Sequence, residues 1–373
     1  MVSLPETIKA LQVQSDRTVK VIDLPFASQE KVKNLPDNQI LLRVRVVGLN
    51  PTDWKHALGD WGNGNTIAGC DAAGDVVAVG SAVTHIKVGD RVAAFGEGGS
   101  WQSDNGAYAE YARFIASAVF VLPPDMTYEE GASFPIPHFT AVQAIHMRFG
   151  VPKPLSPEAA EFKKKGEKIL IWGGSTAVGH HAIQLAALSG LEVYATASPS
   201  AHEYVKALGA SRVFDYKDPD VVSKIREAAG EQGIIYGLDS VSEQSSTTST
   251  IDAMSSTRDG HLMILLPVPD ETQNRRPNIK VELALAYTVL GYPVFFAHVV
   301  HMPAKPDDYA YMLEYNTNVI PRVLDGWKAG QGAPNFRTQK LRVLREGFEG
   351  LEEGLKIMRD GAYGREKLVC KLA

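Results

Sequence analysis

The stretch ILIWGGSTAVGHHAIQLAA, residues 169–187, decides the fold of this chain. Four apolar residues lead into Gly173-Gly174-Ser175-Thr176, and a segment with helical spacing follows. A strand, a glycine turn, a helix and a second strand within about 30 residues form the βαβ unit that binds dinucleotides. Gly173 and Gly174 permit the tight turn, Gly179 permits close packing, and the helix N-terminus offers unpaired N–H groups to a pyrophosphate.

Two other interpretations of this turn are open. A hydrolase nucleophile elbow requires Gly-x-Ser-x-Gly, and Ala177 stands here at the position of the last glycine. A catalytic triad would need Asp239 and His261, which lie among the strands and helices like other residues. The turn could also join strand and helix without a ligand, because its spacing differs from Gly-x-Gly-x-x-Gly. We favour the phosphate site, since all parts of the unit follow in order.

Strand and helix patterns alternate along the middle of the chain. Strands are predicted at KILIW, LEVYATA, RVFDY, IIYGLD and HLMILL, with helices between them. This alternation predicts a parallel sheet covered by helices. Residues 1–140 show short β segments instead, and residues 301–373 contain two helical segments and a final strand, KLVCKL. The connector at 151–168 is rich in proline and lysine, and we expect it to be an exposed loop.

Composition and charge exclude several functional classes. The 373 residues are 45% hydrophobic, which is enough for two globular domains. A net charge of −5 provides no basic field for nucleic acid, and no segment has the ~20 apolar residues of a membrane helix. Cys70 and Cys370 are too few for a disulfide framework or a four-cysteine zinc site. We therefore expect a reducing, cytoplasmic location.

The end of the second strand indicates which dinucleotide binds. A site that prefers NAD places Asp or Glu there, to bind the ribose hydroxyls. This chain has Ser198 and Ser200 in YATASPS, and hydroxyl groups can donate to a 2′-phosphate. Tyr216, after the third strand, is a further candidate donor. We therefore expect NADPH as the cofactor.

The segment GCDAAGDVVAVGSAVTHIKVGDRV, residues 69–92, resembles the signature of the medium-chain dehydrogenase/reductase superfamily. GLNPTDWKH, GGSTAVG, TASPS, FDYKD and GREKLVCKL resemble its zinc-free branch, above all the fungal stand-alone enoyl reductases that serve polyketide synthases. Quinone oxidoreductases share several of these features. The resemblance implies an α/β fold with a GroES-like, β-rich catalytic domain at 1–140, completed by 301–373. It also implies a Rossmann NADPH-binding domain with a doubly wound parallel sheet at 141–300.

The zinc dehydrogenases of that superfamily differ from this sequence at the metal site. Asn50 stands where they have a zinc-ligating Cys, and Cys70 stands where the family has a His. The segment AAFGEGGSWQSDNGAYAEY also lacks the four cysteines of the structural zinc lobe. Because catalytic zinc generally has three protein ligands, we expect no metal here. The expected reaction is hydride transfer to a carbon that is already electrophilic, such as the β-carbon of an α,β-unsaturated carbonyl.

The resemblance also implies roles for single residues. Lys55 in NPTDWK is the candidate general acid or electrostatic partner of an enolate, and the alternative is a surface lysine. Thr140 is expected to begin a helix and to contact the nicotinamide, or merely to cap that helix. His138, in a proline-rich turn, would face the substrate with Phe139 and Thr140, although a packed histidine would explain it as well. The residues expected at the cofactor are Asn50, Pro51, Thr52, Asp53, Gly173, Gly174, Ser175, Thr176, Ala177, Val178, Ser198, Pro199, Ser200, Ala201, Tyr216, Leu265, Leu266, Gly364 and Arg365.

These expectations define a leading function and two alternatives. We expect an NADPH-dependent, zinc-independent reductase of an enoyl thioester on a polyketide chain, with a polyketide synthase as its partner. A quinone or small-enone reductase would need no carrier protein. A protein of another class would bind NADPH without turnover or process an enone without redox chemistry. The sequence does not choose between a monomer and a homodimer.

Overall fold

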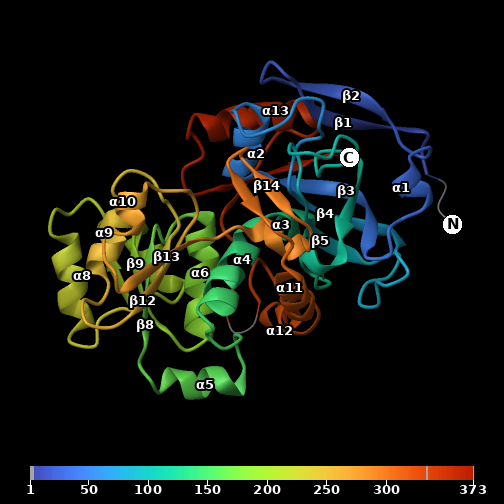
Figure 1. Ribbon diagram of the computed structural model, residues 1–373. Coiled ribbons are helices and arrows are strands. Elements are labelled where there is room, and N and C mark those ends of the chain that lie inside the picture. Colours follow the sequence, from blue (N-terminus) through green and yellow to red (C-terminus); the bar gives the residue numbers. More distant parts are fainter. Residues whose placement is uncertain (1–3, 333–334, 373) are drawn as a thin grey trace. The chain divides into compact units, whose positions relative to one another are not determined.

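The computed structural model describes residues 4–332 and 335–372. They form two compact units, whose helices and strands Figure 1 labels. The first unit extends to Ile136 and resumes at Tyr287, and the second comprises Pro137–Ala286. Within the described ranges, no helix combines the length and apolar character that crossing a membrane requires.

The second unit is built on a six-stranded parallel sheet. Its strands, in spatial order, are β10 (Arg212–Phe214), β9 (Glu192–Thr196), β8 (Lys168–Trp172), β11 (Tyr236–Asp239), β12 (Gly260–Ile264) and β13 (Ile279–Leu283). Every pairing between neighbours is parallel. This is the strand order of a doubly wound Rossmann sheet, and the order reverses between β8 and β11. The predicted parallel sheet is confirmed, and β13 is a strand that the sequence patterns did not identify.

Helices cover both faces of this sheet, because the side chains of a strand alternate between its faces. Leu170 and Trp172 of β8 pack in one apolar cluster with Ile225 of α8 (Val221–Ala229) and Ala253 of α9 (Ser246–Ala253). Helix α6 (Ala177–Leu188) packs on β8 and β9. Helices α7 (His202–Ala207) and α10 (Asp270–Gln273) complete the alternation.

A short helix, α5 (Pro157–Lys163), lies in the connector at 151–168, so the expectation of a loop there was wrong. The Oγ of Ser156 accepts a hydrogen bond from the N–H of Ala159 at 3.1 Å and caps the helix. Pro157 occupies the first helical position, where a missing N–H costs nothing. The proline that suggested a loop therefore marks the start of a helix.

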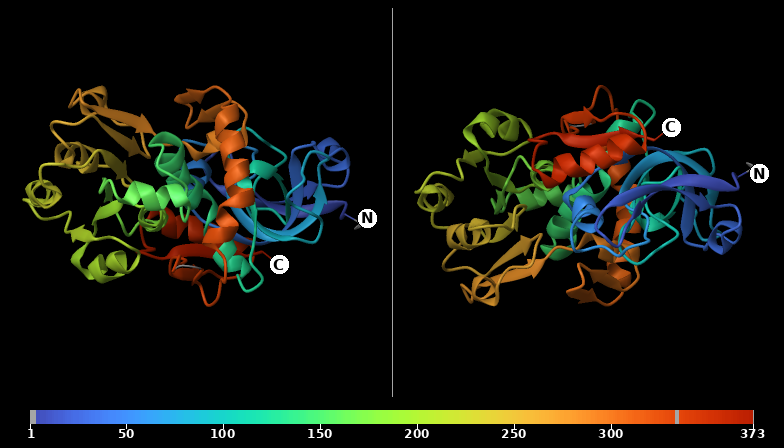
Figure 2. Two further views of the ribbon diagram at one scale, coloured as in Figure 1. Left: turned by 90° about the horizontal axis from the view of Figure 1, so that it is seen from below. Right: turned by 90° about the horizontal axis from the view of Figure 1, so that it is seen from above.

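The first unit contains a mixed seven-stranded sheet. Its strands are β16 (Leu341–Val343), β17 (Lys367–Lys371), β3 (Gln39–Gly48), β4 (Asp71–Val79), β5 (Arg91–Phe95) and β7 (Val119–Val121) in spatial order, with β6 (Tyr111–Ile115) also paired to β3. The C-terminal strand β17 runs antiparallel to β3, and the red and blue ribbons lie together in Figure 2. Two hairpins, β1 (Thr7–Val13) with β2 (Val19–Pro25) and β14 (Val294–Phe296) with β15 (Val300–Met302), complete the strands.

Helix α2 (Pro51–Ala57) follows β3 directly and carries several of the predicted site residues. The carboxylate of Asp53 accepts a hydrogen bond from the N–H of Asn50 at 2.7 Å, and Pro51 occupies the first helical position. Helix α13 (Phe348–Arg359) packs on α2, as Figure 1 shows. The other helices of this unit are α1 (Glu30–Lys33), α3 (Tyr128–Ala132), α11 (Pro306–Asn318) and α12 (Ile320–Val323).

Candidate functional site

The glycine turn after β8 lies where the strand order of the sheet reverses. Gly173 has φ = 86°, and a Cβ at this residue would lie 2.7 Å from Ser240 Oγ and 2.8 Å from the side chain of Val241. Ser240 follows β11, and its hydroxyl donates to the carbonyl of Trp172 at 2.7 Å. The hydroxyl of Thr176 donates to Ser240 Oγ at 2.9 Å. These contacts fix the turn to the carboxyl end of the neighbouring strand, and they require glycine.

The start of helix α6 has the geometry of an anion site. Thr176 is its N-cap, and Thr176 Oγ1 accepts a hydrogen bond from the N–H of Gly179 at 2.9 Å. The N–H groups of Ala177 and Val178 begin the helix, where no intrahelical carbonyl can accept from them. Both residues are only half-buried. A glycine-only turn, a 12-residue helix and the reversal point together fit the pyrophosphate of a dinucleotide.

Hydroxyl groups follow the next two strands of the sheet. Ser198 and Ser200 come after β9, with their Oγ atoms 3.4 Å apart, and Pro199–Ala201 forms a 3₁₀ turn there. Tyr216 follows the adjacent strand β10 and is 45% exposed. Leu265 and Leu266 follow β12, and the N–H of Leu265 donates to Ser242 Oγ at 2.8 Å. The predicted cofactor residues of this unit thus all lie at or after the carboxyl ends of strands.

Asp239, the acid considered for a hydrolase triad, is used by the fold. One carboxylate oxygen accepts the N–H groups of Val241 and Ser242, and the other accepts the hydroxyls of Ser246 and Thr247 at 2.7 Å. His261 pairs instead with Glu282 across β12 and β13 at 3.1 Å. These contacts leave no triad with Ser175.

The structure corrects the predictions for His138 and Thr140. Both residues lie inside helix α4 (Pro135–Val142), which begins at Pro135, so His138 is not in a turn and Thr140 does not begin a helix. His138 and Phe139 are fully buried, whereas Thr140 keeps 7% exposure. The Nδ1 atoms of His138 and His181 lie 3.3 Å apart, and burial lowers the pKa of His138 to about 3.

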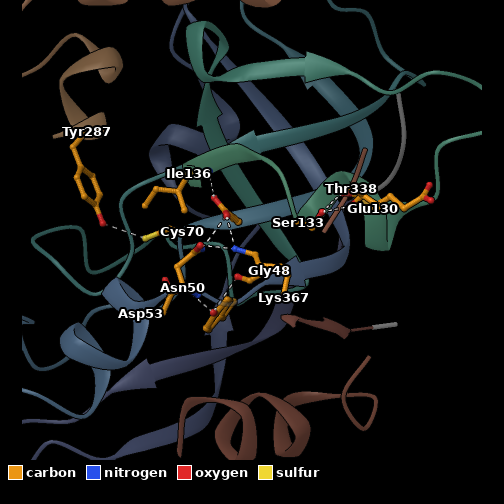
Figure 3. Close-up of polar contacts among 12 residues, drawn as sticks. Gly48, Asn50, Asp53, Cys70, Glu130, Ser133, Ile136, Tyr287, Thr338 and Lys367 are labelled. Carbon is orange, nitrogen blue, oxygen red and sulfur yellow. Dashed lines mark hydrogen bonds and ion pairs between the residues drawn. The ribbon is translucent and has the colours of Figure 1, made fainter. Parts of the chain in front are cut away.

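A buried polar network joins three elements of the first unit (Figure 3). Asp53 accepts the hydroxyl of Tyr108 at 2.9 Å, besides the N–H of Asn50. Asp71 at the start of β4 accepts the side-chain amide of Asn50 at 2.8 Å. The ammonium of Lys367 on β17 donates to Asn50 Oδ1 and lies 3.6 Å from Asp71 Oδ2. The five side chains are at most 3% exposed, so each polar group depends on its partners.

Burial shifts the protonation of this network toward neutral forms. Desolvation raises the pKa of Asp71 to about 7, although the charge of Lys367 opposes the shift. Desolvation also lowers the pKa of Lys367 and raises that of Asp53. The free-energy cost of removing these charges from water therefore exceeds the stabilisation from their mutual attraction.

The side chains at this place do not fit a metal ion. The ammonium of Lys367 lies between Asn50 and Asp71, and a cation there repels another cation. The thiol of Cys70 is buried, and burial raises its pKa well above the usual value. Across residues 4–332 and 335–372, no three His, Cys, Asp or Glu side chains are grouped so that they could hold a metal.

Lys55 and the C-terminal turn are the remaining predicted site residues. The Nζ of Lys55 lies 4.7 Å from the centroid of the Trp61 ring, a cation–π contact, and the residue is half-buried. Gly364 has φ = 59° and precedes Arg365, whose carbonyl accepts from the side chain of Gln339 at 2.9 Å. The structure joins Asn50 and Asp53 in one network, and it places Lys55 on the same helix.

Four residues that contact the start of helix α2 or lie on it were not predicted from the sequence: Asp71, Lys367, Tyr287 and His56. Asp71 and Lys367 each begin a strand, DAAGDVVAV and KLVCK, and three uncharged residues follow each of them. A charge directly before a short uncharged run was the available signal for these two. The sequence around Tyr287 and His56 did not indicate their contacts. The partners of Tyr287 are distant in the sequence, and Thr52 becomes a neighbour of His56 only when helix α2 forms.

Models of two protein families match the chain: the alcohol dehydrogenase GroES-like domain at residues 36–124, and zinc-binding dehydrogenase at residues 177–273. The trans-enoyl reductase ACTTS2 of Alternaria alternata is 33% identical over 98% of this chain and 99% of its own length. The chain belongs to the medium-chain dehydrogenase/reductase superfamily. The predicted resemblance to this superfamily is confirmed, as is its fold of a GroES-like domain and a Rossmann-type domain.

Two further proteins are similar along most of the chain. The enoyl reductase component lovC of the lovastatin nonaketide synthase of Aspergillus terreus is 32% identical over 91% of this chain and 90% of its own length. The structure of the quinone oxidoreductase of Coxiella burnetii matches 98% of this chain and all of its own, with a TM-score of 0.66 and 20% identity. At that identity, the second similarity shows the fold alone.

Proposed function

We propose that this protein is an NADPH-dependent reductase of α,β-unsaturated carbonyl compounds, and that its natural substrate is an enoyl thioester of a polyketide chain. The observation that carries the proposal is the similarity, over almost the whole chain, to a relative named trans-enoyl reductase. The glycine turn at Gly173 supports it, because the residues there fit a dinucleotide. The reaction is the reduction of the C=C bond, with an enolate of the substrate as the species that must be stabilised.

NADPH, when bound, supplies the hydride that is added to the β-carbon of the substrate. In this proposal the N–H groups of Ala177 and Val178 bind the pyrophosphate at the start of α6. The hydroxyls of Ser198 and Ser200 donate to the 2′-phosphate, because they are the polar side chains that follow β9. Thr140, the least buried of residues 138–140, contacts the nicotinamide end.

Lys55 stabilises the negative charge that develops on the carbonyl oxygen of the substrate. An ammonium group aimed at such a charge acts most strongly where water is excluded. Lys55 is half-buried on α2, and the ring of Trp61 restricts its position. Both features favour an electrostatic role over that of a freely solvated surface lysine.

The Lys55→Ala variant tests this role. With crotonyl pantetheine as substrate, we expect the turnover number to fall about 100-fold, because one charge-stabilising donor is lost. The dissociation constant of NADPH, followed by its fluorescence, should remain within about twofold, since no phosphate contact changes. Lys33→Ala, which removes an exposed lysine from α1, is the matched control. Equal turnover of the Lys55 variant and wild type would remove Lys55 from the mechanism.

A substrate panel tests the reaction class. Loss of NADPH absorbance with enoyl pantetheine thioesters, and faster loss with the same acyl group on a carrier protein, would support a polyketide synthase as partner. The name of the Aspergillus terreus relative, a component of such a synthase, motivates that arm. Oxidation of NADPH by free quinones alone would overturn the enoyl assignment. Binding of NADPH without oxidation by any electrophile would overturn the redox function.

A further inference from the structure

A polar cavity of about 240 Å³ lies beside helix α2 in the first unit. It is lined by the loop between β1 and β2, by the loop after α2 and by the tip of the β14–β15 hairpin. The polar side chains of its lining are those of Gln14, Ser15, Arg17, His56, Asp60 and His298. Pockets for drug-sized ligands usually have about 300–1,000 Å³, so this smaller cavity suits a slender chain rather than a bulky group.

His56 is a buried residue of the lining and offers the cavity a hydrogen-bond acceptor. Its Nδ1 lies 2.8 Å from the carbonyl oxygen of Thr52, and because a carbonyl oxygen only accepts, Nδ1 carries the proton. Burial lowers the pKa of His56 to about 4, so the ring is neutral near pH 7 and Nε2 keeps its lone pair. The residue is 3% exposed, and no group within 4–332 or 335–372 donates to Nε2. A ligand in the cavity would therefore meet an acceptor that lacks a partner.

Two opposite charges line the same cavity without pairing. Arg17 and Asp60 are both exposed, and among the described residues neither side chain takes part in an ion pair or a hydrogen bond. Exposed charges need no partner for stability, since water solvates them. Together with the buried acceptor of His56, however, they define a pattern of recognition. An anion can bind to the guanidinium of Arg17, and N–H donors can bind to Asp60 and to His56.

The cavity shares a loop with Lys55, the proposed electrostatic partner of the enolate. Residues 59–64 turn back on α2, so that the N–H of Trp61 donates to the carbonyl of Lys55 at 3.2 Å. This close approach requires glycine, because a Cβ at Gly62 would lie 2.1 Å from the carbonyl oxygen of His56. The ring of Trp61 contacts the Lys55 ammonium, while the residues directly before and after it line the cavity. The same loop therefore contacts Lys55 and forms part of the cavity wall.

We propose that this cavity binds the phosphopantetheine arm of the substrate thioester. The inference rests on the proposed reductase function, because an enoyl thioester of coenzyme A or of a carrier protein holds its acyl group on this arm. The phosphate group of the arm is an anion that fits Arg17, and the two amides supply N–H donors for His56 Nε2 and the Asp60 carboxylate. The arm is also a linear chain, as the size of the cavity requires. Its bound position directs the thioester toward Lys55, whose backbone the cavity loop contacts.

Calorimetric titration with 4′-phosphopantetheine and with pantetheine tests the site without turnover. Wild type should bind phosphopantetheine about tenfold more tightly than pantetheine, because only the first ligand has an anion for Arg17. Arg17→Gln should lose this preference. Lys20→Gln, which removes an exposed lysine from β2 outside the lining, is the matched control and should keep it. Absence of binding to the wild type, or equal preferences in the two variants, would overturn the proposal.

The ¹⁵N resonances of the His56 ring test the buried end of the site. In the free protein Nδ1 should be the protonated nitrogen. Added pantetheine should move the Nε2 resonance to lower frequency, because an amide N–H then donates to its lone pair. His301, which is exposed on β15 and outside the lining, provides a control resonance that should not move. A His56 signal that pantetheine leaves unchanged would exclude this acceptor.

Ser15→Phe fills the cavity from an exposed residue of the β1–β2 loop, so the core of the unit is not altered. Crotonyl pantetheine is compared with S-ethyl thiocrotonate, a thioester without the arm. The ratio of their kcat/KM values should fall about tenfold in this variant. Thr18→Phe adds the same ring in the same loop outside the lining and should keep the wild-type ratio. An unchanged ratio in Ser15→Phe would exclude the cavity as the site of the arm.

Crotonyl-coenzyme A and a crotonylated carrier protein present the same arm and distinguish its source. Faster reduction of one of them identifies that source, and Arg17→Gln should lower kcat/KM for it about tenfold. An undiminished value with both thioesters would overturn the role of Arg17. A wild type that oxidises no NADPH with any thioester would defeat the proposed function, whereas the calorimetric titration and the His56 resonances still decide on the site.

Discussion

The ammonium of Lys367 lies 3.6 Å from the carboxylate of Asp71, and both side chains are at most 3% exposed. Lys367 lies on β17 and Asp71 on β4, the two strands that flank β3. Lys367 also donates to Asn50, the residue that precedes helix α2. The last strand of the chain therefore fixes the start of the helix that carries Lys55. A buried pair of this kind is held by geometry and by its additional hydrogen bonds.

Replacing Lys367 by methionine should destabilise the protein strongly. Above about pH 7, where Asp71 is ionised in the wild type, the variant leaves this carboxylate buried without its cation, and such a change costs about 3–5 kcal/mol of the free energy of unfolding. Urea denaturation followed by circular dichroism measures this loss. The double variant Lys367→Met/Asp71→Asn should recover part of it, because no uncompensated charge remains.

Lys371→Met on the same strand is the matched control. Its ion pair with Glu129 at 2.9 Å is half-exposed, and solvent screening leaves such a pair little effect on stability. If the two lysine variants lost equal stability, the buried pair would have no special role.

Replacing Gly173 by alanine should abolish tight binding of NADPH. The added Cβ would meet Ser240 and Val241 at under 3 Å, and φ = 86° strains any other residue. The turn must shift, which displaces the start of α6. We expect the dissociation constant of NADPH to rise about tenfold or more, which corresponds to about 1.4 kcal/mol, in a fluorescence titration.

Gly150→Ala separates strain from displacement. Gly150 lies in the same unit with φ = 67°, and a Cβ there would have no atom within 4 Å. This control should lose some stability through backbone strain but keep its affinity for NADPH. Normal affinity of the Gly173 variant would move the pyrophosphate to another place.

The nucleotide-binding unit could be predicted because its signals are local. The apolar strand, the glycines and the helix of residues 169–187 lie next to one another, and their spacing alone specifies the βαβ unit. The predictions of local structure were wrong where a proline is compatible with both a turn and the start of a helix. Pro135 and Pro157 were interpreted as turn residues, yet each occupies the first position of a helix. The strand Ile279–Leu283 has polar residues within it and gave no clear alternation.

The buried network of the first unit could be predicted only in part. Asn50 and Asp53 were identified through the family resemblance, but Lys367 and Asp71 become neighbours only when β17 and β4 both pair with β3. Tyr287 reaches Cys70 and Thr52 from a 3₁₀ helix more than 200 residues later in the chain. Contacts between such distant segments depend on strand register, which a single sequence does not specify.

Replacing Ser198 by aspartate should weaken binding of NADPH more than binding of NADH. The carboxylate would repel the 2′-phosphate beside the two hydroxyls, and NADH lacks that phosphate. We expect the dissociation constant of NADPH to rise by about tenfold in a fluorescence titration, with little change for NADH. Ser223→Asp adds the same charge at an exposed position of α8 and should change neither constant. A Ser198 variant with unchanged affinity for NADPH would place the phosphate elsewhere.

Acid should destabilise the protein through histidines that burial keeps neutral. Burial lowers the pKa of His56 and His146 to about 4 and that of His138 to about 3, all below the ordinary value of 6.5. At a pH between the lowered pKa values and 6.5, the unfolded chain therefore binds more protons than the folded chain. The free energy of unfolding falls as the pH falls through this range. Positively charged or ionisable neighbours also lower these pKa values: His298 acts on His56, His146 on His138, and Lys153 on His146.

The His138→Phe variant tests this effect. Between about pH 6.5 and about pH 5, its free energy of unfolding should decrease by about 1–2 kcal/mol less than that of the wild type, measured by urea denaturation. His301→Gln, at an exposed position of β15, should leave the slope unchanged, and equal slopes for the two variants would show that His138 is not held neutral by burial.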